Sequence, residues 1–107
     1  MYTIFLSIED RIDVDLEFEK GRGKPPRLSR FAITCSARIA ERWREVVRYD
    51  NFHRYLHRQK FWRSQEPEPS SDLERVRMDV LLETCRSDLR RNWRRYRSLM
   101  ESTSREG

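Results

Sequence analysis

The stretch MDVLLETCRSDLRRNWRRYRSLM, residues 78–100, decides the fold class. Apolar side chains recur in it at successive spacings of 4, 3, 4, 4, 3 and 4 residues. They are Met78, Leu82, Cys85, Leu89, Trp93, Tyr96 and Met100. This period puts all of them on one face of a helix of about six turns. The stretch therefore predicts a long helix with one buried face.

The predicted helix begins at Ser71, because Ser71-Asp72-Leu73-Glu74 has the pattern of a capping box. We expect it over 71–101, a length of about 45 Å, followed by a frayed tail over 102–107. A second apolar stripe lies on the opposite side of its first half; it consists of Leu73, Val76 and Val80. Either this half is buried on two sides or the helix breaks near residue 82. A helix longer than its sheet leaves apolar surface uncovered, which favours a partner.

Upstream of the helix, residues 2–63 carry the alternation of apolar and polar side chains that is typical of β-strands. The predicted strands are 2–8, 12–18, 28–38, 43–50 and 55–62. The second strand alternates most regularly: Ile12, Val14, Leu16 and Phe18 stand between Asp13, Asp15 and Glu17. One face of this strand is therefore expected in the core, and its three carboxylates are expected in solvent.

The connections complete the predicted architecture. Short turns join most of the strands, and the basic stretch KGRGKPPR, residues 20–27, predicts a mobile connection without a phosphate-binding motif. Two prolines mark residues 64–70 as a linker. We predict one domain over 1–107, of the α+β class. It consists of a four- to five-stranded antiparallel meander, residues 2–63, packed by one long C-terminal helix.

Composition excludes several classes of protein. Charged residues make up 38% of the 107 residues, and no apolar run reaches the ~18 residues that a membrane span needs. The first residues lack a basic leader, so we expect no signal peptide and a cytoplasmic location. The two cysteines, Cys35 and Cys85, form no CxxC motif and are expected to be free, partly buried thiols. Neither a metal nor a cofactor is predicted.

The charge balance favours a phosphate-bearing or acidic partner. The net charge is +5, and only three of the 23 basic residues are lysines, so 20 are arginines. A genome rich in GC codons also explains many arginines, so their distribution matters more than their number. Six of them fall in residues 86–97, where Asp88 is the sole acid; they are Arg86, Arg90, Arg91, Arg94, Arg95 and Arg97. This segment predicts a nucleic-acid-binding helix face, with a merely solvated face as the alternative.

A second polar cluster contains both histidines of the chain. The candidate catalytic residues are Arg48, Asp50, His53, His57 and Arg58. Histidine titrates near neutral pH, so an imidazole with an adjacent carboxylate and guanidinium suits metal-independent cleavage of a phosphodiester. The alternative is a turn whose histidines bond to the backbone.

These segments also carry a resemblance to a known group of proteins. Residues 42–53 with His57-Arg58, followed by Asp88-Leu89, Asn92-Trp93 and Tyr96, resemble a family of small uncharacterised prokaryotic proteins. That family has a W-x-x-V-V-R-Y-D-x-A-H-G-x-x-H-R hairpin and a helix ending D-L/I-x-x-N-W-x-x-Y. The matched hairpin positions are Tyr49, Asp50, Asn51, His53, His57 and Arg58. Phe52 and Arg54 depart from the Ala and Gly of the pattern, which puts the tight turn in doubt.

The Asp-Asn-x-His part of the hairpin is also similar to TumE-type toxins of toxin–antitoxin pairs. The resemblance implies a strand-rich fold with a terminal helix, and a toxin with an antitoxin partner. We therefore predict a toxin-like protein that acts on or binds RNA, and leave open whether it is a ribonuclease. The alternative is a non-enzymatic interaction module that docks an acidic protein or forms a homodimer through its arginine-rich helix. No membrane is expected to take part.

Overall fold

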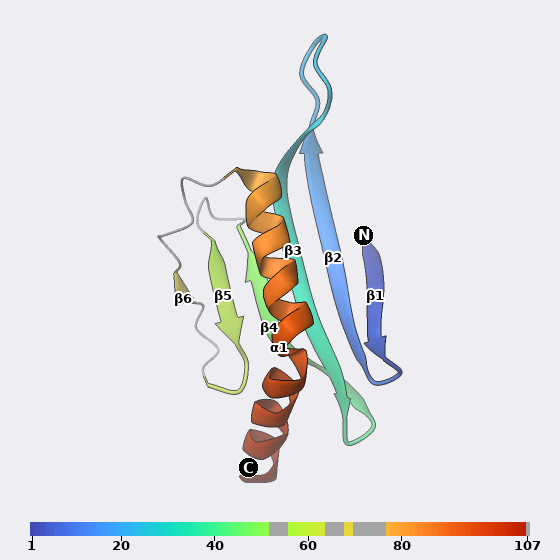
Figure 1. Ribbon diagram of the computed structural model, residues 1–107, viewed down its shortest axis with the longest axis vertical. Coiled ribbons are helices and arrows are strands. Elements are labelled where there is room, and N and C mark those ends of the chain that lie inside the picture. The colour runs from blue at the N-terminus through green and yellow to red at the C-terminus, as the bar shows by residue number, and fades with distance from the viewer. Residues whose placement is uncertain (52–55, 64–67, 70–76, 107) are drawn as a thin grey trace.

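The structure, a computed structural model, consists of one antiparallel sheet with a long helix on one of its faces (Figure 1). It describes residues 1–51, 56–63, 68–69 and 77–106. The strands are β1 (Tyr2–Ser7), β2 (Asp10–Glu19), β3 (Arg27–Ile39), β4 (Arg42–Asp50), β5 (His57–Lys60) and β6 (Glu68–Pro69). The helix is α1 (Met78–Glu106). In the described residues the strands follow one another in sequence order, and each pairs antiparallel with its neighbour.

The predicted α+β class and meander are confirmed, with differences at the fifth strand and beyond. The fifth strand, expected over 55–62, is limited to His57–Lys60, and Tyr55 lies outside the described residues. The linker prediction is wrong for Glu68 and Pro69, which pair with β5 as the short strand β6. An edge strand tolerates proline because the missing N–H can face away from the neighbouring strand.

The helix is shifted toward the C-terminus from its predicted limits. Arg77 is not helical and α1 begins at Met78, while the predicted cap at Ser71 lies outside the described residues. The helix does not break near residue 82, and it continues through 102–106, where we expected a frayed tail. Its first turn contains the acidic residue Asp79, whose negative charge suits the N-terminal end of the helix dipole. The Asp79 carboxylate accepts a hydrogen bond from the Val80 N–H at 2.9 Å.

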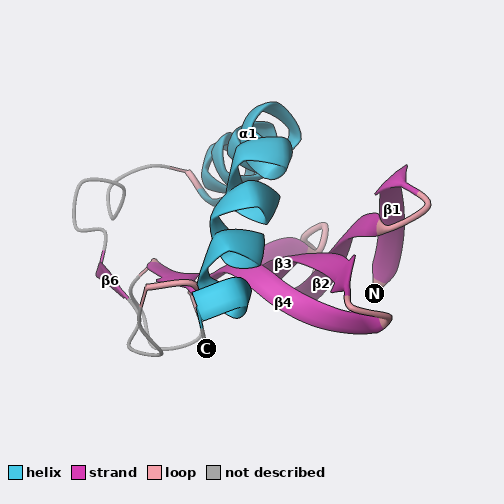
Figure 2. Ribbon diagram, turned by 90° about the horizontal axis from the view of Figure 1, so that it is seen from below, coloured by secondary structure: helices cyan, strands magenta, loops and turns pink. Residues whose placement is uncertain are grey.

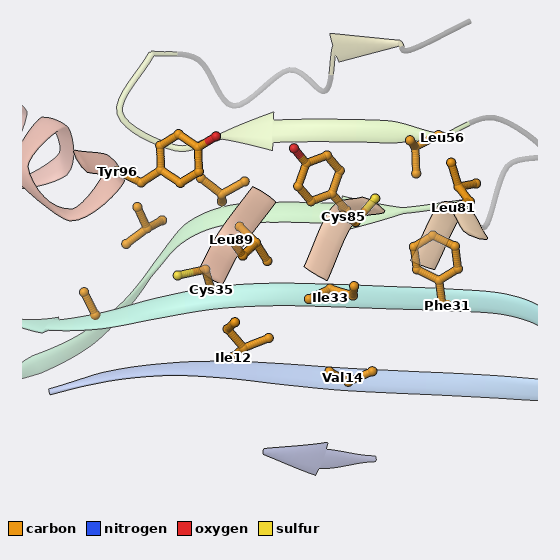
Figure 3. Packing of buried hydrophobic residues seen from close by; sticks show 14 residues of the cluster. Ile12, Val14, Phe31, Ile33, Cys35, Leu56, Leu81, Cys85, Leu89 and Tyr96 are labelled. Atoms are coloured by element: carbon orange, nitrogen blue, oxygen red, sulfur yellow. The ribbon is translucent and has the colours of Figure 1, made fainter. Parts of the chain in front are cut away.

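The core lies between α1 and the covered face of the sheet (Figure 3). Strand register aligns the buried side chains in rows: Ile12 is opposite Cys35, and Cys35 is opposite Val47. The helix buries Leu81, Cys85, Leu89 and Tyr96, with Met78, Leu82, Trp93 and Met100 partly buried beside them. The predicted stripe is thus confirmed. Leu81 is an addition to it, because Leu81 precedes Cys85 by four residues and shares its face.

Both cysteines belong to this core. Cys35 and Cys85 are buried and free, as predicted. Burial, with the charges of nearby carboxylates, raises the pKa of both thiols to about 12. They therefore remain neutral thiols at physiological pH and act as small apolar side chains.

The predicted alternation of the second strand ends before Phe18. The register between β2 and β3 shifts between Glu17 and Phe18, and Phe18 is 53% exposed although it was expected in the core. The far ends of β2 and β3 extend past the beginning of α1 as a two-stranded arm (Figure 1). The basic stretch 20–27 forms the exposed tip of this arm. Phe18 is exposed because the helix does not cover this part of the hairpin.

The turn that joins β3 to β4 has a geometry that is unusual for its sequence. Ile39 pairs with Arg42, so only Ala40 and Glu41 form the connection, with φ angles of 52° and 65°. Two successive positive φ angles are typical of a type I′ turn, which favours Asn-Gly. The left-handed conformation of Ala40 and Glu41 is sterically unfavourable for residues with a Cβ atom, and glycine would remove this strain.

Replacing Glu41 by glycine should therefore stabilise the protein. We expect Glu41→Gly to raise the free energy of unfolding by about 0.5–1 kcal/mol, the relief of the left-handed backbone less the entropy that glycine adds to the unfolded chain. Thermal unfolding followed by circular dichroism measures this change. The control is Arg22→Gly at an exposed loop position, which should not stabilise. A lower Tm for Glu41→Gly would contradict the turn assignment.

Candidate functional site

The candidate catalytic residues are divided between the two faces of the sheet. Asp50 is opposite His57 in the β4–β5 ladder, and Tyr49 is opposite Arg58. Opposed residues point to the same face and successive residues to alternate faces. Arg48, Asp50 and His57 therefore lie on the face away from α1, whereas Arg58 lies on the helix-covered face. His53 lies outside the described residues.

The structure thus brings three of the five predicted residues together. Arg48 and Asp50 form an ion pair, with 3.3 Å between Nε and Oδ2. His57 is half-buried beside Asp50 on the neighbouring strand. Both ring nitrogens of His57 are buried, so the imidazole does not present them to an anion on the open face, and Arg58 lies on the helix-covered face.

The same open face of the sheet contains a shallow groove of about 450 Å³. Its floor is the run of small side chains on β3, namely Ala32, Thr34 and Ser36. The Arg11 guanidinium reaches across from β2 and lies 4.2 Å from the centre of the Trp43 ring on β4. The groove also contains three carboxylates and a second arginine; these are Asp13, Asp15, Glu45 and Arg48. Both arginines are in ion pairs, Arg11 with Asp13 and Arg48 with Asp50, which disfavours a phosphate ligand in the groove.

The predicted solvent-facing carboxylates do lie on this open face. Asp13 is in an ion pair with Arg11 at 3.3 Å and accepts a hydrogen bond from the Thr3 hydroxyl at 2.5 Å. Asp15 and Glu17 are exposed. The prediction that the three carboxylates of the second strand lie on the face away from the core is therefore confirmed.

A polar cluster under the helix was not predicted. Asp88 on α1 accepts hydrogen bonds from the Tyr49 hydroxyl at 2.7 Å, the Tyr96 hydroxyl at 2.8 Å and the Asn92 amide at 2.8 Å. Trp62 stacks on Tyr96, with 5.4 Å between the ring centres. We call these residues the Asp88 cluster: Tyr49, Asp88, Asn92 and Tyr96. It connects β4 to α1 across 39 residues of sequence.

The tyrosines of this cluster act as neutral hydrogen-bond donors. Burial, and then the hydrogen bond to Asp88, raise the pKa of Tyr49 far above its ordinary value and that of Tyr96 to about 12. Arg58 lies on the same side and acts in the opposite direction, because its charge lowers both values. The phenols remain protonated at neutral pH, so the cluster is a hydrogen-bonded anchor for α1.

Asn51, one of the matched hairpin positions, also has a structural role. Its side chain is buried, and its Oδ1 accepts a hydrogen bond from the Phe31 N–H at 2.8 Å. Its own N–H donates to the Phe31 carbonyl at 3.3 Å. The residue therefore extends the β3–β4 pairing past the end of β4.

Two of the six predicted nucleic-acid-binding arginines contact the sheet. Arg97 is in ion pairs with Asp10 at 2.6 Å, Glu9 at 3.1 Å and Glu101 at 2.6 Å. Asp10 is almost fully buried, so Arg97 supplies the charge that its burial requires. Arg86 donates a hydrogen bond to the Tyr2 hydroxyl at 3.1 Å. Both arginines join α1 to the β1–β2 hairpin.

The other four form the exposed arginine row, which we define as Arg90, Arg91, Arg94 and Arg95. Among the residues that the structure describes, none of the four forms an ion pair. Arg94 lies over the ring of its neighbour Trp93, 4.6 Å from the ring centre. The expectation that all six arginines face away from the core is therefore wrong for Arg86 and Arg97.

The described ranges contain neither a metal-ion site nor a membrane-spanning helix. No group of three His, Cys, Asp or Glu side chains there is arranged to hold a metal ion. The described part of the chain also contains no helix that is long and apolar enough to cross a membrane.

These features define a two-layer α+β domain, with a helix anchored on an antiparallel sheet through a partly buried carboxylate. The chain belongs to the DUF7718 family, described as a domain of unknown function, whose model matches residues 1–106. No curated protein and no solved structure matches the chain.

The Asp88 cluster generates a stability prediction. Asp88→Asn removes the charge that strengthens three hydrogen bonds, and presents an amide group to hydroxyl donors. We expect a loss of about 2–3 kcal/mol in the free energy of unfolding, measured by urea denaturation. Glu83→Gln is the matched control, because Glu83 is an exposed carboxylate on the same helix. Its loss should stay below about 0.5 kcal/mol; equal losses in both variants would refute the anchoring role.

The raised pKa values predict that the free energy of unfolding depends on pH. A phenol whose pKa is higher in the folded state than its unfolded value of about 10 stabilises the folded protein. This contribution is fully present below the unfolded pKa, and it is lost as the pH rises above that value. Tyr49 and Tyr96 act in this way, and Cys35 and Cys85 act in the same direction from about pH 9. The free energy of unfolding should therefore fall between about pH 9 and 12. Tyr49→Phe should show a shallower fall, whereas a flat profile up to pH 12 would be incompatible with the buried cluster.

Proposed function

We propose that this protein binds RNA through the exposed arginine row of α1. The observation that carries the proposal is the arrangement of these four charges. Arg90–Arg94 and Arg91–Arg95 are like-charge pairs four residues apart, each of which weakens a helix by about 0.2–0.5 kcal/mol. Among the described residues no acid compensates them. A helix shaped only by stability would carry acids at some of these positions.

The chemistry of the row favours phosphate as the ligand. Guanidinium groups present a planar set of donors that matches phosphate oxygens, and they also stack on unpaired bases. The net charge of +5 attracts a polyanion from a distance. Both arginines of the groove on the other face are paired with carboxylates, so a nucleic acid is favoured at the row. Contacts of this kind supply affinity without sequence specificity.

The position of His57 argues for binding rather than cleavage. His57 and Asp50 lie on the face of the sheet away from α1, and the row lies on the helix. A phosphodiester held by the row is therefore not placed at the imidazole. The toxin-like role and the ribonuclease activity stay predictions, because they depend on His53 and on a substrate path that the described residues do not form.

The test is the salt dependence of RNA binding. Fluorescence anisotropy with a labelled single-stranded RNA, between about 50 and 200 mM salt, gives the slope of log K against log salt. Arg90→Gln/Arg94→Gln should weaken binding and reduce the slope by about 1.4, since each lost phosphate contact contributes about 0.7. Arg42→Gln/Arg44→Gln is the matched control. It removes the same charge from exposed positions on β4.

The control should keep most of the slope. Equal effects of the two double variants would mean that net charge, and not the row, determines binding. Absence of RNA binding at about 50 mM salt would overturn the proposal. It would leave the docking of an acidic protein or a merely solvated face as explanations for the row.

A further inference from the structure

The two edges of the sheet differ in how they are protected. At one edge, β6 has two residues and ends in Pro69, which cannot donate a hydrogen bond. At the other edge, β1 has six residues, pairs with β2 on one side, and has no described neighbour on the other. Its sequence, YTIFLS, contains no charged residue in a chain that is 38% charged. Edge strands that must stay unpaired usually carry charges, prolines or bulges.

Apolar side chains are exposed along this same edge. Phe5 is 63% exposed on the face away from α1, and Ile8, just after the strand, is 91% exposed. Met1 is also exposed. The β1–β2 ladder has an irregularity between Phe5 and Ser7, so the regular part of the strand is Tyr2–Phe5. The edge therefore combines unpaired backbone groups with uncovered apolar surface.

We propose that β1 is a self-association edge, which pairs antiparallel with β1 of a second copy of this chain around a two-fold axis. This axis is perpendicular to the sheet, so corresponding faces of the two copies lie on the same side. Residues that pair must therefore point to the same face, which requires the axis to lie between the two copies of one β1 residue. An axis at Phe5 brings the two Phe5 rings together on the open face. It also places Ile4 opposite Leu6 of the second copy. This register covers Phe5, the most exposed apolar side chain within the strand.

Charge favours a second copy as the occupant of this edge. Most surfaces of a chain with a net charge of +5 repel their equivalents. The uncharged strand β1 is a segment where two copies approach without bringing like charges together. Arg86 and Arg97, which contact Tyr2, Glu9 and Asp10, connect α1 to the β1–β2 hairpin and so fix the direction of the edge. Figure 2 shows β1 at the side of the sheet, next to β2 and apart from α1. A preformed edge pays little ordering entropy on pairing.

The association has a consequence for the shape of the assembly. Both helices lie on the same side of the joined sheet, because the two-fold axis is perpendicular to it. The two exposed arginine rows then face the same side, where one polyanion can reach both. The self-association itself does not depend on RNA binding, and it is tested without RNA.

Sedimentation equilibrium at about 100 μM protein, which detects micromolar dimers, tests the proposal. We expect the wild-type chain to have twice the 13.2 kDa monomer mass, and Phe5→Lys to have the monomer mass. Phe18→Lys is the matched control, because it adds the same charge at another half-exposed aromatic side chain; it should remain dimeric. A monomeric wild type, or a dimeric Phe5→Lys, overturns the proposal.

A second measurement does not rely on a destabilising charge. Under mild oxidation, Phe5→Cys should form an intermolecular disulfide in high yield, since residues opposed across a two-fold axis approach within disulfide range. Phe18→Cys should not, and the buried Cys35 and Cys85 provide no competing thiol. Equal cross-linking at both positions, or none at Phe5→Cys, refutes the register.

Discussion

The position of α1 on the sheet depends on the hydrogen bond that the Tyr49 hydroxyl of β4 donates to Asp88. A carboxylate placed under a helix needs donors, because its desolvation is costly when it is left unpaired. The two phenols and the Asn92 amide supply them at 2.7–2.8 Å. The Tyr96 and Asn92 donors belong to α1 itself, so Tyr49 is the donor that ties Asp88 to the sheet and determines the rotation of the helix about its axis. That rotation buries Leu89 and turns the exposed arginine row outward.

A second polar anchor acts on the opposite flank of the helix. Arg97 contacts Asp10, Glu9 and Glu101, and also donates to the Arg38 carbonyl at 3.1 Å. One flank of α1 is thus held by a carboxylate on the helix, and the other by a guanidinium on the helix. The apolar stripe between them supplies most of the burial, but apolar contacts are not directional. The polar anchors determine register, and they separate structural arginines from those left for a ligand.

Short-range patterns account for what the sequence could predict. The spacing of apolar residues in α1 and the alternation in β2 indicated the class, the meander and the buried helix face. Long-range pairings were beyond reach: nothing near Asp88 in the chain identifies Tyr49 as its partner. One signal was the isolated acid in a cationic segment. The other was that all four residues of the Asp88 cluster belong to the pattern of the family resemblance. Ala40 and Glu41 likewise lack the Asn-Gly signal of their turn, and Phe18 follows a bulge that alternation cannot reveal.

The candidate catalytic cluster illustrates the same limit in a different way. His57 and Arg58 are successive residues of a strand, so they cannot both point toward Asp50. This exclusion could have been derived once 57–60 was assigned as a strand. The side on which each residue lies needed the register with β4. The division leaves Arg58 with the Asp88 cluster and leaves the open face with Arg48, Asp50 and His57.

A double-mutant cycle between Tyr49 and Asp88 tests whether their hydrogen bond holds α1 on the sheet. The free energies of unfolding of the wild type, Tyr49→Phe, Asp88→Asn and the double variant give the coupling between the two side chains. If this hydrogen bond anchors α1, the coupling between Tyr49 and Asp88 should be at least about 1 kcal/mol, as is typical of a charge-assisted hydrogen bond between partly buried groups. A coupling of about zero, with additive losses, would contradict it.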